Sequence, residues 1–525
     1  MRSLARVIIL ALAIVPVSLM AQSPRTGTAE RRPNILFIMT DDHARRALSC
    51  YDSSLIITPS IDRIAQEGVR FTQAFVTNAL CGPSRAVILT GQYSHRNGLR
   101  DNRDRFDPER ITFPRLLQEA GYQTALVGKW HLRSEPRGFD RWTILPGQGD
   151  YYNPRFLRMG DTLETTGYVT DIITELTLEA LRSMDRDRPF CLLMHHKAPH
   201  RNWMPAPRHL TMFQGEDLPE PPTLQDDYAT RSAAAREQEL EIGRHMFLGM
   251  DLKLPVEYVA QFSTDNALIA GFDAVGAWQK ILENLTLEQR ATWERAYGPE
   301  NAAFLGAPPQ GERLLRWKYQ RYIKDYLRCV ASVDESVGRV LDYLDSSGLA
   351  ASTLVVYTSD QGFFLGEHGW FDKRFMYEES AGMPLLLRYP EGITAGVTRN
   401  ELVLNLDLAP TLLDLAGVTV PDYMQGASLR GLLRGGAAGV WRQALYYHYY
   451  EYPHGWHAVK RHYGIRTPSY KLIHFYDDID AWELYDLQRD PQELRNLIDS
   501  PAHRHLVDSL RTVLGGLQRD LGDEF

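Results

Sequence analysis

Two adjacent carboxylates, Asp41 and Asp42, follow a continuous apolar run that covers residues 33–40. An apolar run without polar alternation is typical of a β-strand that is buried on both faces. The carboxyl end of such a strand in an open α/β sheet is where ligands bind, and carboxylates buried there need a positive counter-charge. A hard divalent cation would supply that charge. The alternative is a solvated acidic turn at the end of the strand.

A cysteine opens a second stretch of chemical interest, residues 81–91, which reads CGPSRAVILTG. Pro83 and Ser84 fit the first turn of a helix, because proline lacks the N–H group that would be unpaired there. Cys81 would then lie just before a helix N-terminus, which attracts anions, and the planar guanidinium of Arg85 suits a tetrahedral oxyanion. The stretch predicts an anion pocket with a nucleophile candidate at its mouth. The alternative is a buried structural thiol.

Basic side chains follow two further apolar runs. Residues 123–128 precede Lys129 and His131, and a spacing of two places both side chains on the same side of an extended chain. Residues 189–195 lead to His200. A lone lysine or histidine is most often a surface or structural residue. These positions become candidate site residues because they follow strands whose ends are expected to meet.

Strand-like and helix-like patterns alternate along most of the chain. Apolar runs cover residues 33–40, 123–128, 189–195, 352–359 and 384–389, and helical patterns cover residues 60–67, 113–120, 170–184 and 316–344. This alternation predicts an α/β fold with a large, mostly parallel sheet between helices. Looser, proline-punctuated sequence at residues 205–310 indicates a helical insertion into this domain, which we place at residues 32–430.

The last part of the chain has a different pattern. Short alternating segments predict antiparallel strands at residues 444–450, 463–467, 470–476 and 482–486, and a final helix is predicted to start at residues 490–497. Glycine-rich sequence at residues 431–439 marks the boundary. We therefore expect a smaller antiparallel α+β subdomain at residues 440–525.

Composition narrows the class of protein and its location. With 525 residues, 44% of them hydrophobic, the chain can bury a large core, and a net charge of -8 gives no indication of nucleic-acid binding. Residues 1–21, with Arg2 and Arg6 before an apolar run, predict a cleaved signal peptide, and hence a secreted or periplasmic protein without a membrane span after cleavage. The alternative is an uncleaved anchor. The pairing of Cys50, Cys191 and Cys329 is left open.

The motif C-x-P-S-R-x-x-x-L-T-G at residues 81–91 resembles the signature of the type I sulfatases, and G-K-W-H-L at residues 128–132 resembles their second motif. The resemblance implies the alkaline-phosphatase-like or sulfatase-like fold and oxidation of Cys81 to formylglycine by a formylglycine-generating maturation enzyme. It also implies a Ca²⁺ ion, held by Asp41, Asp42, the modified Cys81, Asp360 and Gln361. Family members usually have Asn or His where this chain has Gln361, but a glutamine carbonyl is still a hard oxygen ligand.

The same resemblance implies catalytic roles. Arg85, Lys129 and Lys373 would neutralise the sulfate oxygens, and a hydroxyl of the formylglycine hydrate would attack sulfur. His200 would protonate the departing sugar oxygen, a role that Lys373 could share. His131 would remove the proton that lets the sulfated intermediate collapse and release sulfate.

Three further stretches, residues 200–205, 363–368 and 447–452, resemble bacterial N-acetylglucosamine-6-O-sulfatases that act on glycosaminoglycans such as heparan or heparin, or on mucin glycans. On this basis the predicted sugar contacts are Arg201, His368, His448, Glu451, His462 and Arg466. For residues 447–452 the alternative is an aromatic ladder between neighbouring strands.

Other functions stay open from the sequence alone. One is a sulfatase for uronate-2-O or aryl sulfates, which would share the catalytic residues. Another is a phosphate or phosphonate monoester hydrolase of the same superfold, although no second set of metal ligands is found beside the motifs. The last is a non-catalytic sulfated-glycan binding protein, if Cys81 stays unmodified.

Overall fold

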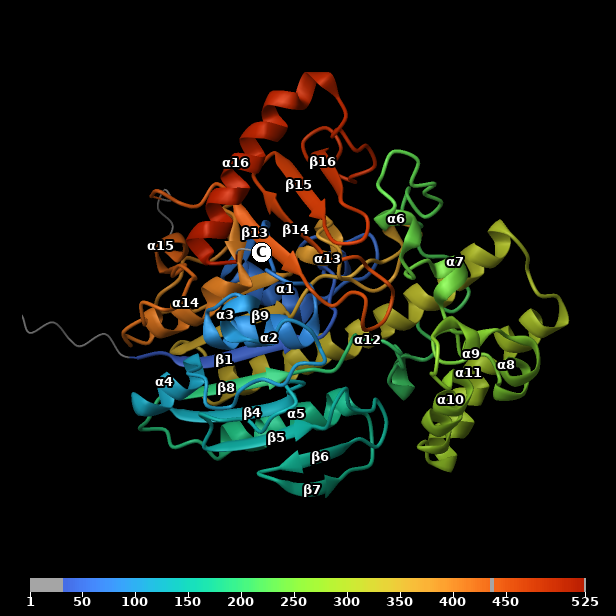
Figure 1. The fold of residues 1–525 in the computed structure, drawn as a ribbon. Helices are drawn as coiled ribbons and strands as arrows, with labels where there is room; N and C mark the ends of the chain where they lie inside the picture. The colour runs from blue at the N-terminus through green and yellow to red at the C-terminus, as the bar shows by residue number, and fades with distance from the viewer. Residues whose placement is uncertain (1–31, 435–438, 524–525) are drawn as a thin grey trace, which may run out of the picture. The chain divides into compact units, whose positions relative to one another are not determined.

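The computed structural model describes residues 32–434 and 439–523 (Figure 1). The predicted signal peptide, residues 1–21, lies outside the described residues. The described residues from Pro33 onward form one compact unit. Within the described residues, no helix is both long enough and apolar enough to cross a membrane.

A ten-stranded mixed sheet forms the centre of this unit, in the order β11-β2-β10-β9-β1-β8-β4-β5-β6-β7. Its central strands are parallel neighbours: β9 (Thr353–Ser359), β1 (Asn34–Thr40), β8 (Phe190–His195), β4 (Gln123–Lys129) and β5 (Arg141–Leu145). Because these strands run in one direction, their carboxyl ends meet at one edge of the sheet. The candidate residues Asp41, Lys129, His200 and Asp360 lie at or after the carboxyl ends of β1, β4, β8 and β9.

The outer strands of the sheet are partly antiparallel. They are β10 (Leu385–Arg388), β2 (Val69–Phe71) and β11 (Val397–Arg399) on one side, and β6 (Arg155–Arg158) and β7 (Asp161–Glu164) on the other. A separate pair joins β3 (Ala74–Phe75) to β12 (Val403–Leu404). The prediction of a large, mostly parallel sheet between helices is confirmed.

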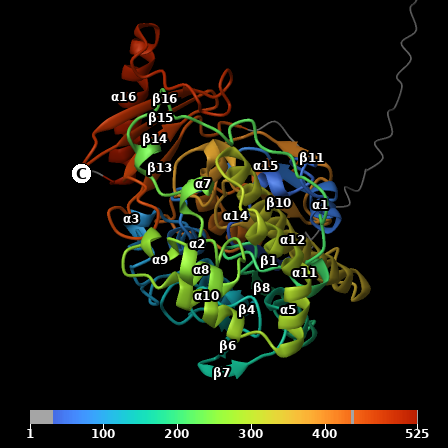
Figure 2. The same cartoon turned by 90° about the vertical axis from the view of Figure 1, so that its right-hand side faces the viewer.

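Helical layers cover both faces of the parallel centre (Figure 2). Along β1, Leu36 and Ile38 belong to one apolar core, whereas Ile35, Phe37 and Met39 belong to the other, as the alternation of side chains along a strand requires. The first core includes α1 (Pro59–Gln66), α5 (Val169–Arg182) and α12 (Glu312–Ser346), and the second includes α2 (Cys81–Thr90), α4 (Phe113–Glu119) and α14 (Leu408–Leu415).

The region predicted as a helical insertion consists of irregular chain followed by helices of different lengths. These are α6 (Ala234–Glu237), α7 (Ile242–His245), α8 (Val256–Phe262), α9 (Asp265–Leu268), α10 (Ala274–Glu283) and α11 (Leu287–Gly306). Short helices elsewhere are α3 (Ser94–Asn97), α13 (Glu378–Ala381) and α15 (Arg430–Leu433).

The C-terminal segment forms the predicted antiparallel sheet. Its strands pair in chain order: β13 (Leu445–Tyr449), β14 (His462–Arg466), β15 (Tyr470–Phe475) and β16 (Ala481–Asp486). Helix α16 (Arg504–Leu521) packs along this sheet (Figure 1). Apolar residues of the sheet share one core with the central sheet.

The prediction that the final helix starts at residues 490–497 is wrong, because that segment is irregular and the helix begins at Arg504. Glu493 explains the difference. Its carboxylate is fully buried and lies 2.7 Å from the ammonium of Lys471, and its backbone has a φ of 54°. A positive φ is incompatible with a right-handed helix.

All four cysteines are free thiols. Cys81, Cys191 and Cys329 are buried and Cys50 is half-buried. Cys50, Cys191 and Cys329, whose pairing the sequence left open, therefore form no disulfide bond in the structure.

Candidate active site

Three carboxylates meet at the carboxyl ends of neighbouring parallel strands. Asp41 and Asp42 follow β1 and Asp360 follows β9, in a register that pairs Thr40 with Ser359. All three carboxylates are fully buried, and one oxygen of each lies within 4.8 Å of the others. The backbone N–H of Asp42 donates to Asp360 Oδ1 at 3.1 Å. The predicted strand ends thus come together as one acidic cluster.

The donor set of this cluster fits a cation. Asp41 Oδ1 and the side-chain oxygen of Gln361, Oε1, are buried without a hydrogen-bond partner. Burial raises the pKa of Asp42 to about 6, and burial together with the charge of Asp41 raises the pKa of Asp360 to about 7. Unpaired carboxylate and amide oxygens in a buried cluster are what a hard divalent ion would bind.

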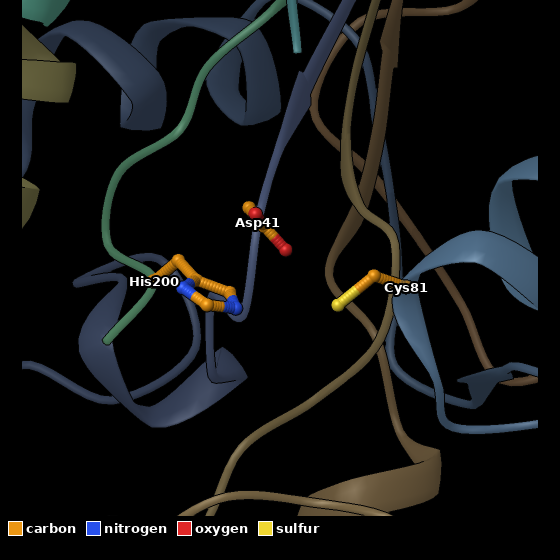
Figure 3. Close-up of side chains that lie close together, drawn as sticks. All are labelled: Asp41, Cys81 and His200. Atoms are coloured by element: carbon orange, nitrogen blue, oxygen red, sulfur yellow. The ribbon is translucent and has the colours of Figure 1, made fainter. Parts of the chain in front are cut away.

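Cys81 lies in the same space (Figure 3). It is the first residue of α2, one position inside the helix rather than just before it, and Leu80 is the N-cap. Its sulfur, a carboxylate oxygen of Asp41 and a ring nitrogen of His200 lie within 4.8 Å of one another. Burial raises the pKa of the Cys81 thiol above its ordinary value. An unmodified thiol here would stay protonated, which disfavours it as a nucleophile.

Three basic side chains balance the acidic cluster. Arg85, one turn into α2, donates from Nε to Asp360 Oδ2 at 3.0 Å and from Nη1 to the Lys129 carbonyl at 2.8 Å. Lys129, at the end of β4, forms an ion pair with Asp41. Lys373 donates to both oxygens of Asp42 at 2.6 and 2.7 Å. All three predicted cations are therefore in place around the carboxylates.

Two histidines complete the set. His200 Nδ1 lies 2.6 Å from the Arg201 carbonyl and donates to it, so that Nε2 is left toward Asp42, whose Oδ2 is 3.7 Å away. Nδ1 of His131 is buried and has no hydrogen-bond partner. Burial and the nearby charge of Lys129 lower the pKa of both histidines, so both rings are neutral when no sulfate is bound.

The predicted sugar contacts in the four-stranded sheet have protein partners instead. His448 is bonded to Asp523 at 2.7 Å and to the Tyr476 hydroxyl at 2.7 Å. His462 uses one ring nitrogen for the Lys460 carbonyl and the other for the backbone N–H of Met376. Both rings are buried and bonded within the protein, which favours a structural role, and their contact with the sugar stays a prediction.

Arg466 and His368 are likewise used inside the protein. The guanidinium of Arg466 forms an ion pair with Glu378 and lies over the Phe75 ring. His368 is fully buried, with Nδ1 3.0 Å from Asp226. Both side chains have protein partners, and their predicted contact with the sugar stays a prediction.

Arg201 and Glu451 lie closer to the catalytic set but are also paired. Arg201, next to His200 in the chain, forms a two-fold ion pair with Asp251 and lies over the Phe371 and Trp456 rings. Glu451 pairs with Arg374, the neighbour of Lys373. Their predicted contact with substrate stays a proposal.

The sequence missed three residues that support this site. Gln148 accepts a hydrogen bond from Lys129 with its side chain and one from Lys197, at 3.2 Å, with its carbonyl. Asp372 and Arg374 flank Lys373, are buried and bond to each other at 3.0 Å. The run of charged residues around Lys373 indicated the second pair, whereas nothing in the local sequence singles out Gln148.

Comparisons with known proteins agree with this geometry. A model of the sulfatase family matches residues 33–418, and a model of the C-terminal part of N-sulphoglucosamine sulphohydrolase matches residues 366–520. The chain is 49% identical over 528 residues to an N-acetylglucosamine-6-O-sulfatase of Bacteroides thetaiotaomicron, with 100% of this chain and 92% of that protein covered. It is 27% identical over 449 residues to N-acetylglucosamine-6-sulfatase of Homo sapiens, covering 80% and 67% of the two chains.

Solved structures give the same result. One protein, solved in complex with its substrate D-glucosamine-2-N,6-O-disulfate, superposes with a TM-score of 0.90 at 50% identity, covering 94% of this chain and 99% of that one. Phosphonate monoester hydrolase of Agrobacterium radiobacter has a TM-score of 0.67 at 20% identity, covering 93% and 96%, a likeness of fold alone. By its motifs, its site and these matches, the chain belongs to the sulfatase family.

Proposed function

We propose that this protein hydrolyses the 6-O-sulfate ester of N-acetylglucosamine or a related glucosamine in glycosaminoglycans (heparan or heparin) or mucin-type glycans. The observation that carries the proposal is the buried meeting point of Cys81, the three carboxylates and three basic side chains. The choice of sugar and position is supported by 49% identity to an N-acetylglucosamine-6-O-sulfatase across both chains.

Two groups would complete the site. Ca²⁺, held by Asp41, Asp42, Asp360, Gln361 and the modified Cys81, would supply Lewis-acid polarisation of the sulfate oxygens. Formylglycine at Cys81, made by a maturation enzyme, would supply the hydroxyl nucleophile. The buried, unpartnered oxygens of Asp41 and Gln361 support the first assignment, and the raised pKa of the Cys81 thiol supports the second, because an unmodified thiol would be a poor nucleophile.

The protein's own side chains would bind the sulfate and move protons. Lys129 and Lys373 would shift their ammonium groups from carboxylate to sulfate oxygens, and Arg85 would hold Asp360 in place through its 2.9 Å ion pair. The negative charge of a bound sulfate ester beside His200 would raise the pKa of this ring. It would thereby favour the protonated form that donates to the leaving oxygen. His131, with a free Nδ1, would act as the base of the release step.

Export follows from the same proposal. The predicted signal peptide would direct the chain to the periplasm or outside the cell, where it would encounter sulfated glycans. The partners we propose are therefore a sulfated glycan substrate and, before or during export, the maturation enzyme.

A second candidate is hydrolysis of an N-sulfate. It is favoured by one observation, the match of residues 366–520 to the C-terminal model of N-sulphoglucosamine sulphohydrolase. Both reactions can use the same catalytic set, and they differ in which sulfate of the sugar enters it.

The experiment uses D-glucosamine-2-N,6-O-disulfate, N-acetylglucosamine-6-sulfate, N-acetylglucosamine-3-sulfate and a uronate-2-sulfate as parallel substrates for enzyme produced in a host that oxidises Cys81. The products are separated by chromatography and identified by mass spectrometry. We expect release of the 6-sulfate only, with the N-sulfate retained. Loss of the N-sulfate alone would favour the second candidate. Release from the uronate, or from none of these while Cys81 is shown to be formylglycine, would contradict the proposal.

A further inference from the structure

One tyrosine of the long helix α12 closes the turn that carries two of the carboxylates. The hydroxyl of Tyr326 donates to the carbonyl of Asp42 at 2.7 Å and accepts from the backbone N–H of Ala44 at 2.8 Å. Tyr326 lies 284 residues from Asp42 in the sequence and is fully buried. This hydroxyl therefore holds the turn together with two oxygens at the carboxyl end of β9. Asp360 Oδ1 accepts from the N–H of Asp42 at 3.1 Å, and Ser359 Oγ accepts from the N–H of His43 at 2.9 Å.

The turn needs such support. Asp42 has a φ of 66°, in the left-handed region that non-glycine residues rarely adopt without surrounding restraints. Asp42 and Ala44 are also buried, so their backbone groups would lack water if the hydroxyl were removed. The conformation that aims the Asp42 carboxylate thus depends in part on Tyr326.

The same ring contacts the other segment of the acidic cluster. Tyr326 stacks on Phe363, with ring centroids 5.7 Å apart and an interplanar angle of 20°, and Phe363 follows Asp360 and Gln361 by only a few residues. Tyr326 therefore touches both chain segments that supply oxygen ligands. Its own helix is long and packs in the core beneath the sheet, which makes it a rigid support.

We propose that Tyr326 is a positioning residue for the cation site, and that its hydroxyl holds the Asp41–Asp42 turn in the geometry that binds the ion. This rests on the proposed function, in which Asp42 and Asp360 bind Ca²⁺. Partners that orient metal ligands typically change metal affinity by about 10- to 100-fold when they are removed. The conservative substitution Tyr326→Phe keeps the ring and its contact with Phe363 and deletes the one oxygen atom.

A matched control exists on the same helix. Tyr319 is also fully buried, and its hydroxyl donates to the Pro219 carbonyl at 2.7 Å, away from the carboxylates. Tyr319→Phe removes an equivalent hydroxyl and hydrogen bond from α12. Any general weakening of the helix should appear in both variants, whereas a loss of ion affinity should appear in one.

The test measures Ca²⁺ binding by calorimetry on the full chain after chelator treatment, together with the rise in melting temperature on adding Ca²⁺. We expect wild type and Tyr319→Phe to bind with the same affinity within about twofold, and Tyr326→Phe to bind about 10- to 100-fold more weakly. Sulfate release by Tyr326→Phe should recover as Ca²⁺ is raised, and Tyr319→Phe should show no such dependence beyond that of the wild type. Should Tyr326→Phe be too unstable for calorimetry, its Ca²⁺ affinity is taken from the rise in melting temperature with Ca²⁺ concentration, measured beside Tyr319→Phe.

The outcomes separate the two proposals. Equal affinity of Tyr326→Phe and wild type would overturn the role of Tyr326 while leaving the calcium site intact. Absence of Ca²⁺ binding by the wild type would overturn both. A similar loss of affinity in Tyr319→Phe and Tyr326→Phe would mean that α12 acts only through general stability.

Discussion

The catalytic edge of the central sheet and the four-stranded C-terminal sheet are built from similar residues but use them differently. Both place histidines beside carboxylates: the half-buried His200 beside Asp42 in the first, and the buried His448 beside Asp523 in the second. At the catalytic edge some polar atoms are left without partners, such as Asp41 Oδ1 and Gln361 Oε1. In the C-terminal sheet, both ring nitrogens of His462 and of His448 are bonded to other protein groups.

This difference separates binding chemistry from structural chemistry. A buried polar atom without a partner costs free energy, so it persists where a ligand supplies the missing interaction. A buried histidine whose two nitrogens are both occupied has nothing left to offer a substrate. For these histidines residue type does not separate the two cases, whereas the partners of the ring nitrogens do: both nitrogens of His462 are bonded, and Nδ1 of His131 is not.

The largest effect should come from the nucleophile position. Cys81→Ala should lower sulfate release from the 6-sulfated sugar by at least about 10⁴-fold, because no other group in the site can form the covalent intermediate. Cys191→Ala, which changes a buried thiol in β8, should keep the activity within a few fold. Release of sulfate is measured by ion chromatography, and the mass of the peptide that contains residue 81 reports its oxidation. Comparable losses in both variants would remove the distinction between the two thiols.

His200→Ala should lower kcat on a sugar sulfate by about 10²–10⁴-fold, as expected when a general acid is lost. The loss should be much smaller on an aryl sulfate, whose leaving group needs no proton. The control is His196→Gln, at a fully buried histidine four positions earlier in the chain, which should change kcat only slightly. Equal losses on both substrates would show that His200 does not act as the acid.

His462→Gln should change stability and leave catalysis alone. Removing one or both of its hydrogen bonds leaves the Lys460 carbonyl or the Met376 N–H buried without a partner, so the free energy of unfolding should fall by about 1–3 kcal/mol. The values of kcat and KM, measured below the melting temperature, should stay within about twofold. A large rise in KM at unchanged stability would restore the predicted sugar contact.

The smallest effect concerns the pH dependence of stability in the C-terminal sheet. Burial alone would raise the pKa of Asp523, but the hydrogen bond and charge of His448 outweigh it, and the pKa falls to about 2. Burial lowers the pKa of His448 to about 4, so at pH 7 the hydrogen bond, and not the charge of His448, stabilises the ionised carboxylate. The ionised form therefore stabilises the fold above about pH 4 and loses this contribution as pH falls toward 2. Asp523→Asn should lower the free energy of unfolding by about 1–2 kcal/mol at pH 7, and the difference from wild type should shrink toward pH 2. A difference that is independent of pH would contradict this origin.

Much of the fold could be predicted because the central strands of the large sheet are continuous apolar runs in the sequence. The runs before Asp41 and Asp360 became adjacent parallel strands, and the run before Lys129 became a parallel strand that β8 separates from β1. The residues after these strands therefore meet at one edge of the sheet. The final helix was placed too early because Glu493 is drawn inward by Lys471, a partner that local sequence does not reveal. Local sequence likewise does not reveal that His448 and His462 are bonded to partners within the protein, since these partners come from other elements.

The sequence by itself determined the central parallel strands and main helices, though not β5, β6 and β7, and, through the motif at residues 81–91, the sulfatase chemistry to expect. Local patterns suffice for this because apolar periodicity depends on neighbours in the chain. Only the tertiary structure decided which buried polar groups are already paired, and which hydroxyl supports the turn at Asp42. Those facts depend on pairs such as Tyr326 and Asp42, separated by 284 residues, and on the low tolerance of a packed core for unpartnered polar atoms.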